Sequence, residues 1–182
     1  MKYALVTGGG RGIGAAICRQ LASQGFCVII NYKSSADSAR ALADEIEANG
    51  GSAELLPFDV SSSNQVDAAI GQWEDNHPSQ YISVLVNNAG MGIGGSLELA
   101  TPEEIDLQIG TNFMGCVNMG QAVLPHMRKQ RQGRIINLSS IGGIMGLPYQ
   151  GYYSASKFAI EGFSEALSAE VKGFGITVSM VE

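Results

Sequence analysis

The sequence lacks the features that mark several classes of protein. It has 11 Lys and Arg against 17 Asp and Glu, a net charge of −6, which argues against nucleic acid or an anionic membrane as the main partner. It contains no apolar run of roughly 18 residues, so no membrane-spanning helix is expected. Because 45 % of its 182 residues are apolar and only 15 % are charged, we expect a globular chain with one domain over residues 1–182.

Cysteine and histidine are also scarce. Cys18, Cys27 and Cys116 form no CxxC pair and lie in apolar stretches, so they are expected to be reduced and buried. This pattern favours an intracellular, cytoplasmic protein. The two histidines have no neighbour at metal-ligand spacing, and no metal site is predicted. Met1 leads directly into an apolar segment that is too short for a signal peptide.

Short apolar segments alternate with helical periodicities along the chain. Strands are expected at 3–6, 27–30, 53–58, 82–86, 134–138 and 176–181. Helices are expected around 13–21, 42–46, 66–73, 101–131 and 154–173, and the fourth of these could contain a break. It should begin at the capping box Thr101-Pro102-Glu103-Glu104. Strands that are apolar throughout and alternate with helices predict an α/β fold, with a doubly wound parallel sheet between two layers of helices.

A glycine-rich stretch follows the first predicted strand. Residues 7–14 read Thr-Gly-Gly-Gly-Arg-Gly-Ile-Gly. Glycines between a strand and a helix allow a tight turn and let backbone N–H groups approach a pyrophosphate. A P-loop is excluded because no Gly-Lys-Ser/Thr follows, and the dinucleotide fingerprint is met only in its relaxed form ending in Ala. The alternative is a merely structural turn. We predict a dinucleotide site whose contacts here are Thr7, Gly8, Gly10, Arg11, Gly12, Ile13 and Gly14.

The region after the second strand bears on which dinucleotide is bound. An NAD site usually places an acidic residue there to hold the ribose 2′-hydroxyl, whereas this chain reads Asn31-Tyr32-Lys33-Ser34. The cations Arg11 and Lys33 suit a 2′-phosphate, so NADP(H) is predicted over NAD(H). The alternative is that both are solvated surface charges. The remaining predicted cofactor contacts are Asn31, Lys33, Asp59, Val60, Asn88, Ala89, Gly90, Tyr153 and Lys157. As isolated residues, Asp59 would be a helix N-cap and the pair Asn87-Asn88 a turn.

The stretch from Ser139 to Lys157 follows the fifth strand. Tyr153 and Lys157 are four positions apart at the start of a helix and therefore share a face. A phenol has an unperturbed pKa near 10, and an ammonium group one turn away favours its ionised form, which suits acid–base work near neutral pH. Taken alone, such a pair is more often a packed aromatic beside a solvated lysine. Ser139 and Ser140 lie where open α/β sheets keep their ligand crevice.

Together these stretches resemble the short-chain dehydrogenase/reductase family. The matching motifs are Thr7-Gly8-x-x-x-Gly12-x-Gly14, Asn87-Asn88-Ala89-Gly90, and Tyr153-x-x-x-Lys157 with Ser140 thirteen positions before the tyrosine. The resemblance implies a Rossmann-like sheet in the order 3-2-1-4-5-6. It also implies a catalytic set of Asn112, Ser140, Tyr153 and Lys157.

The resemblance assigns each of these four residues a role. Ser140 would hold the substrate carbonyl oxygen, and Tyr153 would act as the general acid or base. Lys157 would assist Tyr153 and bind the nicotinamide ribose, and Asn112 would hold a proton-relaying water. The implied activity is NAD(P)(H)-dependent interconversion of a ketone and a secondary alcohol, by an NADP-dependent enzyme acting on a CH–OH group. A non-catalytic nucleotide-sensing or scaffold protein with the same fold is the alternative.

The resemblance leaves substrate and assembly less defined. The first half is similar to 3-oxoacyl reductases and the second to hydroxysteroid and retinol dehydrogenases, so the small-molecule carbonyl or alcohol substrate stays open. A homodimer or homotetramer is implied, formed by the helices at 101–131 and 154–173. Family members normally continue past the sixth strand into a substrate lid and a last strand. Because the sequence stops at Glu182, we expect a C-terminally truncated chain that lacks both.

Overall fold

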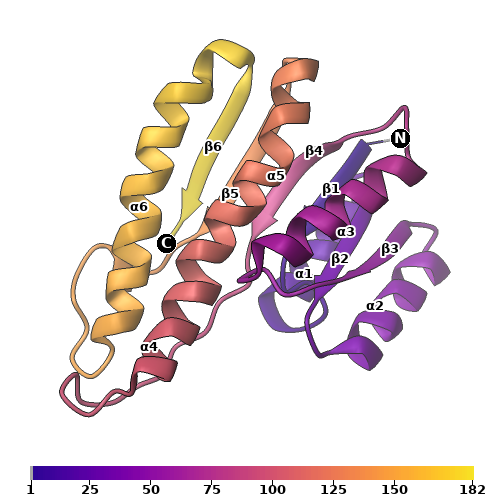
Figure 1. Cartoon of the computed structure of the whole chain (residues 1–182). Coiled ribbons are helices and arrows are strands. Elements are labelled where there is room, and N and C mark those ends of the chain that lie inside the picture. Colours follow the sequence, from indigo (N-terminus) through magenta and orange to yellow (C-terminus); the bar gives the residue numbers. More distant parts are fainter. Residues whose placement is uncertain (1) are drawn as a thin grey trace.

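The computed structural model describes residues 2–182, in which strands and helices alternate (Figure 1). The strands are β1 (Lys2–Val6), β2 (Phe26–Tyr32), β3 (Ser52–Pro57), β4 (Ile82–Asn87), β5 (Gly133–Leu138) and β6 (Ile176–Val181). The α-helices are α1 (Gly12–Ser23), α2 (Ala36–Ala48), α3 (Ser63–Asn76), α4 (Pro102–Ile109), α5 (Gly115–Gln130) and α6 (Gly151–Val171).

The six strands form one parallel sheet in the order β3-β2-β1-β4-β5-β6. This confirms the predicted doubly wound fold and its strand order. The chain leaves β3 at one edge and returns to the middle of the sheet as β4, beside β1. A reversal of strand order opens a crevice at the carboxyl ends of the two central strands, which is where such sheets bind ligands.

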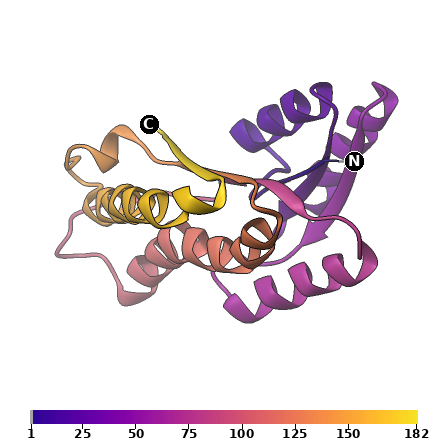
Figure 2. The ribbon, with the colours of Figure 1, turned by 90° about the horizontal axis from the view of Figure 1, so that it is seen from above.

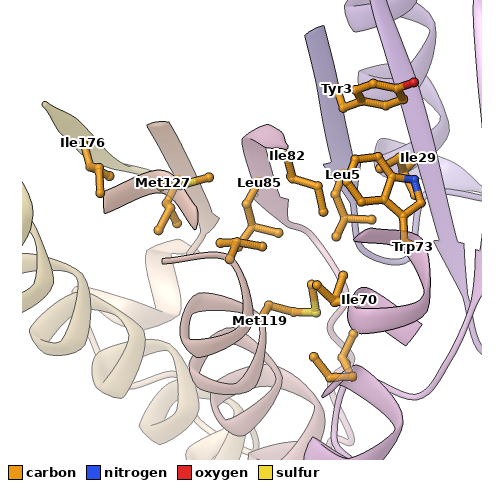
Figure 3. Close-up of a cluster of buried hydrophobic side chains, with 14 of the residues drawn as sticks. Tyr3, Leu5, Ile29, Ile70, Trp73, Ile82, Leu85, Met119, Met127 and Ile176 are labelled. Atoms are coloured by element: carbon orange, nitrogen blue, oxygen red, sulfur yellow. The ribbon is translucent and has the colours of Figure 1, made fainter. Parts of the chain in front are cut away.

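Alternating residues of each strand face opposite layers of helices. Tyr3 and Leu5 of β1 point toward α3, α5 and α6, in a core that also contains Trp73 and Met119 (Figure 3). Ala4 of β1 and its neighbours on the other face pack against α1 and α2. Figure 2, which views the sheet from above, shows the two layers on either side of it. The sheet therefore has helices on both faces, as the uninterrupted apolar strands predicted.

The predicted helix at 101–131 begins at the expected capping box of Thr101 and Glu104, and the break that the prediction allowed is a π-helical turn at Gly110–Met114 between α4 and α5. Several other boundaries differ from the sequence-based ones. The last helix begins at Gly151, three residues before the predicted start. A short 3₁₀ helix at Ile141–Gly143, which was not predicted, follows β5.

The three cysteines are buried and unpaired, as predicted. Burial raises the pKa of Cys18 and Cys116 to about 12 and that of Cys27 to about 11. These thiols are therefore neutral at ordinary pH. Within residues 2–182, no three His, Cys, Asp or Glu side chains are grouped as metal ligands. Over the same residues, no helix has the length and apolarity needed to cross a bilayer.

Candidate active site

A cavity of about 490 Å³ opens at the carboxyl ends of β1, β2 and β4. It has the size of a typical small-molecule site. Most of the predicted cofactor residues line it, and they come from four separate turns of the chain. They are Gly8, Arg11, Gly12, Ile13, Gly14, Asn31, Lys33, Asp59, Val60, Asn88, Ala89 and Gly90.

The first turn of α1 presents an anion-binding end to this cavity. Its N-cap residue Arg11 makes no side-chain capping bond, and the first turn contains no acidic residue. The first backbone N–H groups of the helix therefore remain available to a phosphate. Gly8 and Gly12 adopt left-handed conformations, with φ of +60° and +55°, which glycine adopts without strain. A Cβ on Gly14 would overlap the carbonyl oxygen of Gly8. These features fit a dinucleotide pyrophosphate.

Thr7 and Asn88 join the turn after β1 to the turn after β4. The Thr7 hydroxyl oxygen accepts hydrogen bonds from the backbone N–H groups of Asn88 and Ala89, each at 3.0 Å. The Asn88 amide donates in return to the carbonyl oxygens of Thr7 and Gly8, at 2.8 and 3.2 Å. Thr7 is buried and is absent from the cavity lining. Its place in the structure is that of a brace for the turns, rather than the predicted direct contact.

Gly10 also lies behind the cavity wall. It is buried, and a Cβ on it would contact Ser35 and Ala39 at 3.1 and 3.2 Å. Its small size therefore lets the turn approach α2. Asn31, by contrast, lines the cavity and also supports it, because its side-chain oxygen accepts a bond from the Gly8 backbone N–H at 3.2 Å. Gly10 and Thr7 are thus predicted contact residues that lie beside the cavity lining and do not face the cavity.

Lys33 and Asp59 form an ion pair across the far end of the cavity. The Lys33 ammonium lies 2.6 Å from an Asp59 carboxylate oxygen. Burial alone would raise the pKa of the Asp59 carboxyl, but hydrogen bonds from Lys33 and Ser61 outweigh it and hold the pKa below its usual range. Sequence reasoning placed both residues at the cofactor but did not pair them. The contact depends on the ends of β2 and β3 lying side by side.

Tyr153 and Lys157 share one face of α6, as predicted. The Lys157 ammonium lies 5.6 Å from the centre of the Tyr153 ring and donates a 2.7 Å hydrogen bond to the carbonyl oxygen of Leu138. Only 6 % of Lys157 is exposed, and this burial lowers the pKa of its ammonium. A Cβ on Gly90, which lines the cavity, would lie 3.8 Å from the Lys157 ammonium. The pair therefore borders the cavity.

Asn112 connects this pair to the turn after β4. Its side-chain oxygen accepts from the Met91 N–H and its amide donates to the Met91 carbonyl, both at 2.8 Å. The amide also donates to the Ser156 hydroxyl at 3.0 Å, and that hydroxyl donates to the Tyr153 carbonyl at 2.6 Å. Both amide hydrogens of Asn112 are thus donated within the protein, and its oxygen keeps one further acceptor position. Sequence reasoning missed Ser156, although a serine three positions after Tyr153 can bond back to its carbonyl on a helix.

Ser140 caps the 3₁₀ helix that leads out of β5. Its hydroxyl oxygen accepts the Gly142 N–H at 3.1 Å, which leaves the hydroxyl proton free to be donated elsewhere. A Cβ on Gly142 would lie 3.2 Å from the Tyr153 ring, so the segment starting at Ser140 passes directly beside that ring. The structure therefore brings Asn112, Tyr153 and Lys157 together, with the segment that begins at Ser140 beside the Tyr153 ring.

Comparisons with known proteins agree with this geometry. A family model described as short chain dehydrogenase matches residues 2–182. The 3-ketodihydrosphingosine reductase of Bacteroides thetaiotaomicron is 49 % identical over 178 residues, covering 98 % of this chain and 61 % of that protein. A 3-oxoacyl-(acyl-carrier-protein) reductase of Staphylococcus epidermidis is 41 % identical over 180 residues, covering 99 % of this chain and 73 % of that protein.

Two solved structures extend the similarity to the fold. A metagenomic short-chain oxidoreductase in complex with NADP has a TM-score of 0.94 and 36 % identity, covering 98 % of this chain and 80 % of that one. A gluconate 5-dehydrogenase from Burkholderia cenocepacia in complex with NADP and tartrate has a TM-score of 0.92 and 33 % identity, covering 98 % of this chain and 69 % of that one. The chain spans about three fifths of the Bacteroides reductase. The match over residues 2–182 shows that the chain belongs to the short-chain dehydrogenase family of oxidoreductases.

Proposed function

We propose that this protein is an NADP(H)-dependent oxidoreductase that interconverts a ketone and a secondary alcohol, with Tyr153 as its general acid and base. The observation that supports the proposal best is the placement of Tyr153 and Lys157 at the edge of the dinucleotide cavity, held through Ser156 and Asn112. The reductase names of two relatives and the NADP complexes of two structural neighbours agree with it.

The protein's own groups supply the proton and the orientation of the substrate. The bound nicotinamide would supply or accept the hydride. In reduction, the Tyr153 hydroxyl donates its proton to the carbonyl oxygen as negative charge develops there. The Ser140 hydroxyl, whose oxygen already accepts from Gly142, donates a hydrogen bond to the same oxygen. Oxidation of the alcohol uses the same groups in reverse.

Lys157 supports this chemistry as a fixed positive charge. Its ammonium is anchored on the Leu138 carbonyl and lies above the Tyr153 ring. Two further donor positions of the ammonium remain available, and one of them would hold the nicotinamide ribose. Asn112 then acts on Tyr153 through Ser156, as a positioning residue.

The acid–base role predicts the effect of removing one oxygen. Tyr153→Phe should lower kcat by roughly 10²- to 10⁴-fold and leave NADPH affinity nearly unchanged, because the ring stays in place. Tyr152→Phe is the matched control: its hydroxyl bonds only the Leu97 carbonyl, at 3.3 Å, and kcat should stay within about twofold. Steady-state NADPH oxidation with a panel of ketones measures both. A fully active Tyr153→Phe enzyme would refute the mechanism.

The cofactor preference rests on the charges at the far end of the cavity. Lys33 is already neutralised by Asp59, whereas Arg11 has no ion-pair partner within 4 Å among the described residues. An ammonium held by a carboxylate must exchange that partner for a phosphate, which reduces the net gain in the binding free energy of the cofactor. Arg11 should therefore contribute more than Lys33 to the binding of a 2′-phosphate.

This asymmetry can be measured by titrating the two reduced cofactors. Arg11→Ala should weaken NADPH binding about tenfold or more, the cost of one charge-assisted hydrogen bond, and Lys33→Ala should weaken it less. NADH binding should change little in either variant. Arg19→Ala is the control, because Arg19 lies on α1 and forms an exposed ion pair with Glu45 of α2. Equal dissociation constants for NADPH and NADH in the parent protein would contradict the preference.

The buried ammonium of Lys157 predicts a pH-dependent stability. Its pKa is lowered by burial in the folded protein, whereas the unfolded chain keeps the ordinary value. Between those two values the unfolded state binds more protons, so stability rises with pH. Relative to Lys157→Met, which lacks the titration, the parent should gain free energy of unfolding as pH rises toward about 10.5. Urea unfolding at several pH values tests this, and a constant difference would contradict it.

The relatives' names suggest two kinds of ketone for this site. One is named for 3-ketodihydrosphingosine and the other for 3-oxoacyl groups on an acyl carrier protein. A homodimer or homotetramer is also proposed, formed through α5 and α6; Met114, which directly precedes α5, and Phe158 of α6 are exposed. Exposed apolar side chains on neighbouring helices are consistent with a subunit contact, and sedimentation of the full-length protein would establish it.

A further inference from the structure

Exposed apolar side chains gather on the two loops that flank Tyr153. One loop connects β4 to α4 and the other connects β5 to α6. Six of the twelve large hydrophobic residues that the structure leaves exposed lie on these loops, each between 52 % and 76 % exposed. We call them the apolar rim, and they are Leu97, Leu99, Ile141, Ile144, Met145 and Tyr149. Apolar side chains concentrated in this way mark an interaction site.

The two loops contact each other and the Tyr153 helix. The Gly95 N–H donates to the Tyr149 carbonyl at 2.8 Å. Leu97 lies so close to Gly151, the first residue of α6, that no Cβ would fit there. At the inner ends of the loops, Gly92 and Gly142 stand beside the Tyr153 ring. The apolar rim is therefore the outward continuation of the place where the carbonyl group would react.

The same loops carry no positive charge. From Ile82 to Pro125 the sequence has no Lys, Arg or His, and from Ile135 to Ser156 it has no charged residue of any kind. The one charged residue between β4 and α4 is acidic, Glu98. A phosphate or carboxylate next to the reacting ketone would find no cation here to pair with, and burying an unpaired charge is costly.

Resting on the proposed function, we propose that the substrate is a ketone with a long aliphatic chain and no negative charge beside the carbonyl. The chain would lie along the apolar rim. Each methylene group that leaves water there adds at most about fourfold to binding. Two properties of the loops thus set the substrate class: their exposed apolar surface, which favours binding of an aliphatic chain, and their lack of cations.

The test compares matched ketones in the full-length protein. The probes are methyl 3-oxobutanoate, methyl 3-oxohexadecanoate and 3-oxohexadecanoyl-coenzyme A, which carries phosphates. We expect kcat/KM to rise at least about tenfold from the short to the long neutral ester and to fall for the coenzyme A thioester of the same chain. In Ile144→Gln/Met145→Gln, kcat/KM should drop about tenfold for the long ester and stay within about twofold for the short one.

Phe174→Gln is the control, because Phe174 is an exposed apolar residue after the far end of α6. This variant should change kcat/KM for neither ester. A preference for the thioester, or rates that are independent of chain length, would overturn the proposal. A rim variant that loses subunit contacts or stability, and keeps its long-chain activity, would show that the rim packs against protein, either another copy of the chain or another segment, and would overturn the proposal. If no ester is turned over, the proposed function fails. Calorimetric titration of the two long-chain ketones, with NADP⁺ present, then still decides the substrate class.

A separate observation concerns the two glycines that flank Tyr153. A Cβ on Gly92 would lie 3.3 Å from the Cδ2 atom of the ring, and a Cβ on Gly142 would lie 3.2 Å from Cε1. These atoms belong to opposite edges of the ring. An added methyl group on either side would push Tyr153 by a few tenths of an ångström, and the other glycine sets how far it can move.

We infer that Gly92 and Gly142 are positioning residues that leave room for Tyr153 at its reactive orientation. Gly92→Ala and Gly142→Ala should each lower kcat by about tenfold or more through misplacement of the hydroxyl, with NADPH affinity unchanged and the pH profile of kcat displaced. Gly162→Ala, on the same helix with nothing within 4 Å of its Cβ, is the control and should stay at parental kcat. Unchanged kcat and pH profile in both flanking variants would refute the role, and a loss of NADPH affinity would show a general distortion instead.

Discussion

The hydrogen bond from the Lys157 ammonium to the Leu138 carbonyl is the contact on which the site depends most. Leu138 is the last residue of β5, and Lys157 lies in the second turn of α6. The 2.7 Å bond therefore fixes the start of the helix to the end of the sheet. Because Tyr153 is one turn earlier on the same face, this anchor also sets the position of its ring. A charge buried this far requires such a partner, since unpaired burial would destabilise the fold.

The cofactor side is held by an equally rigid contact between β1 and β4. Thr7 and Asn88 exchange hydrogen bonds across the neighbouring ends of these strands. These bonds are made between protein groups and involve no ligand atom, so they reduce the ordering that binding requires. Thr7 illustrates a structural use of a motif residue: its hydroxyl oxygen accepts hydrogen bonds from the backbone N–H groups of Asn88 and Ala89, so these donors are satisfied within the protein.

Much of the fold could be predicted from the sequence because each strand is apolar throughout and each helix is periodic. The motifs predicted the residues of the site, and most of the predicted cofactor residues line one cavity in the structure. What could not be predicted depends on contacts between distant segments. The Lys33–Asp59 pair requires the register of β2 against β3. The engagement of Asn112 by Met91 requires the π-helical turn that carries Asn112 to meet the turn after β4. No local pattern encodes either contact.

Charge divides the crevice into two chemically different ends. Arg11, Lys33 and the unoccupied N–H groups of α1 gather where a dinucleotide would place its phosphates. Beyond Lys157, the loops between β4 and α4 and between β5 and α6 contain no cation at all. In a chain of net charge −6, this distribution concentrates the attraction for anions at one end. A ligand with phosphates is therefore oriented by the field of the protein before it makes close contacts. A neutral ketone experiences little of that field, so the shape and apolar surface of the loops must select it. On the proposed function, the two ligands would meet at Tyr153 and Lys157 through different forces, with the ammonium of Lys157 as the last positive charge before the loops that carry no cation.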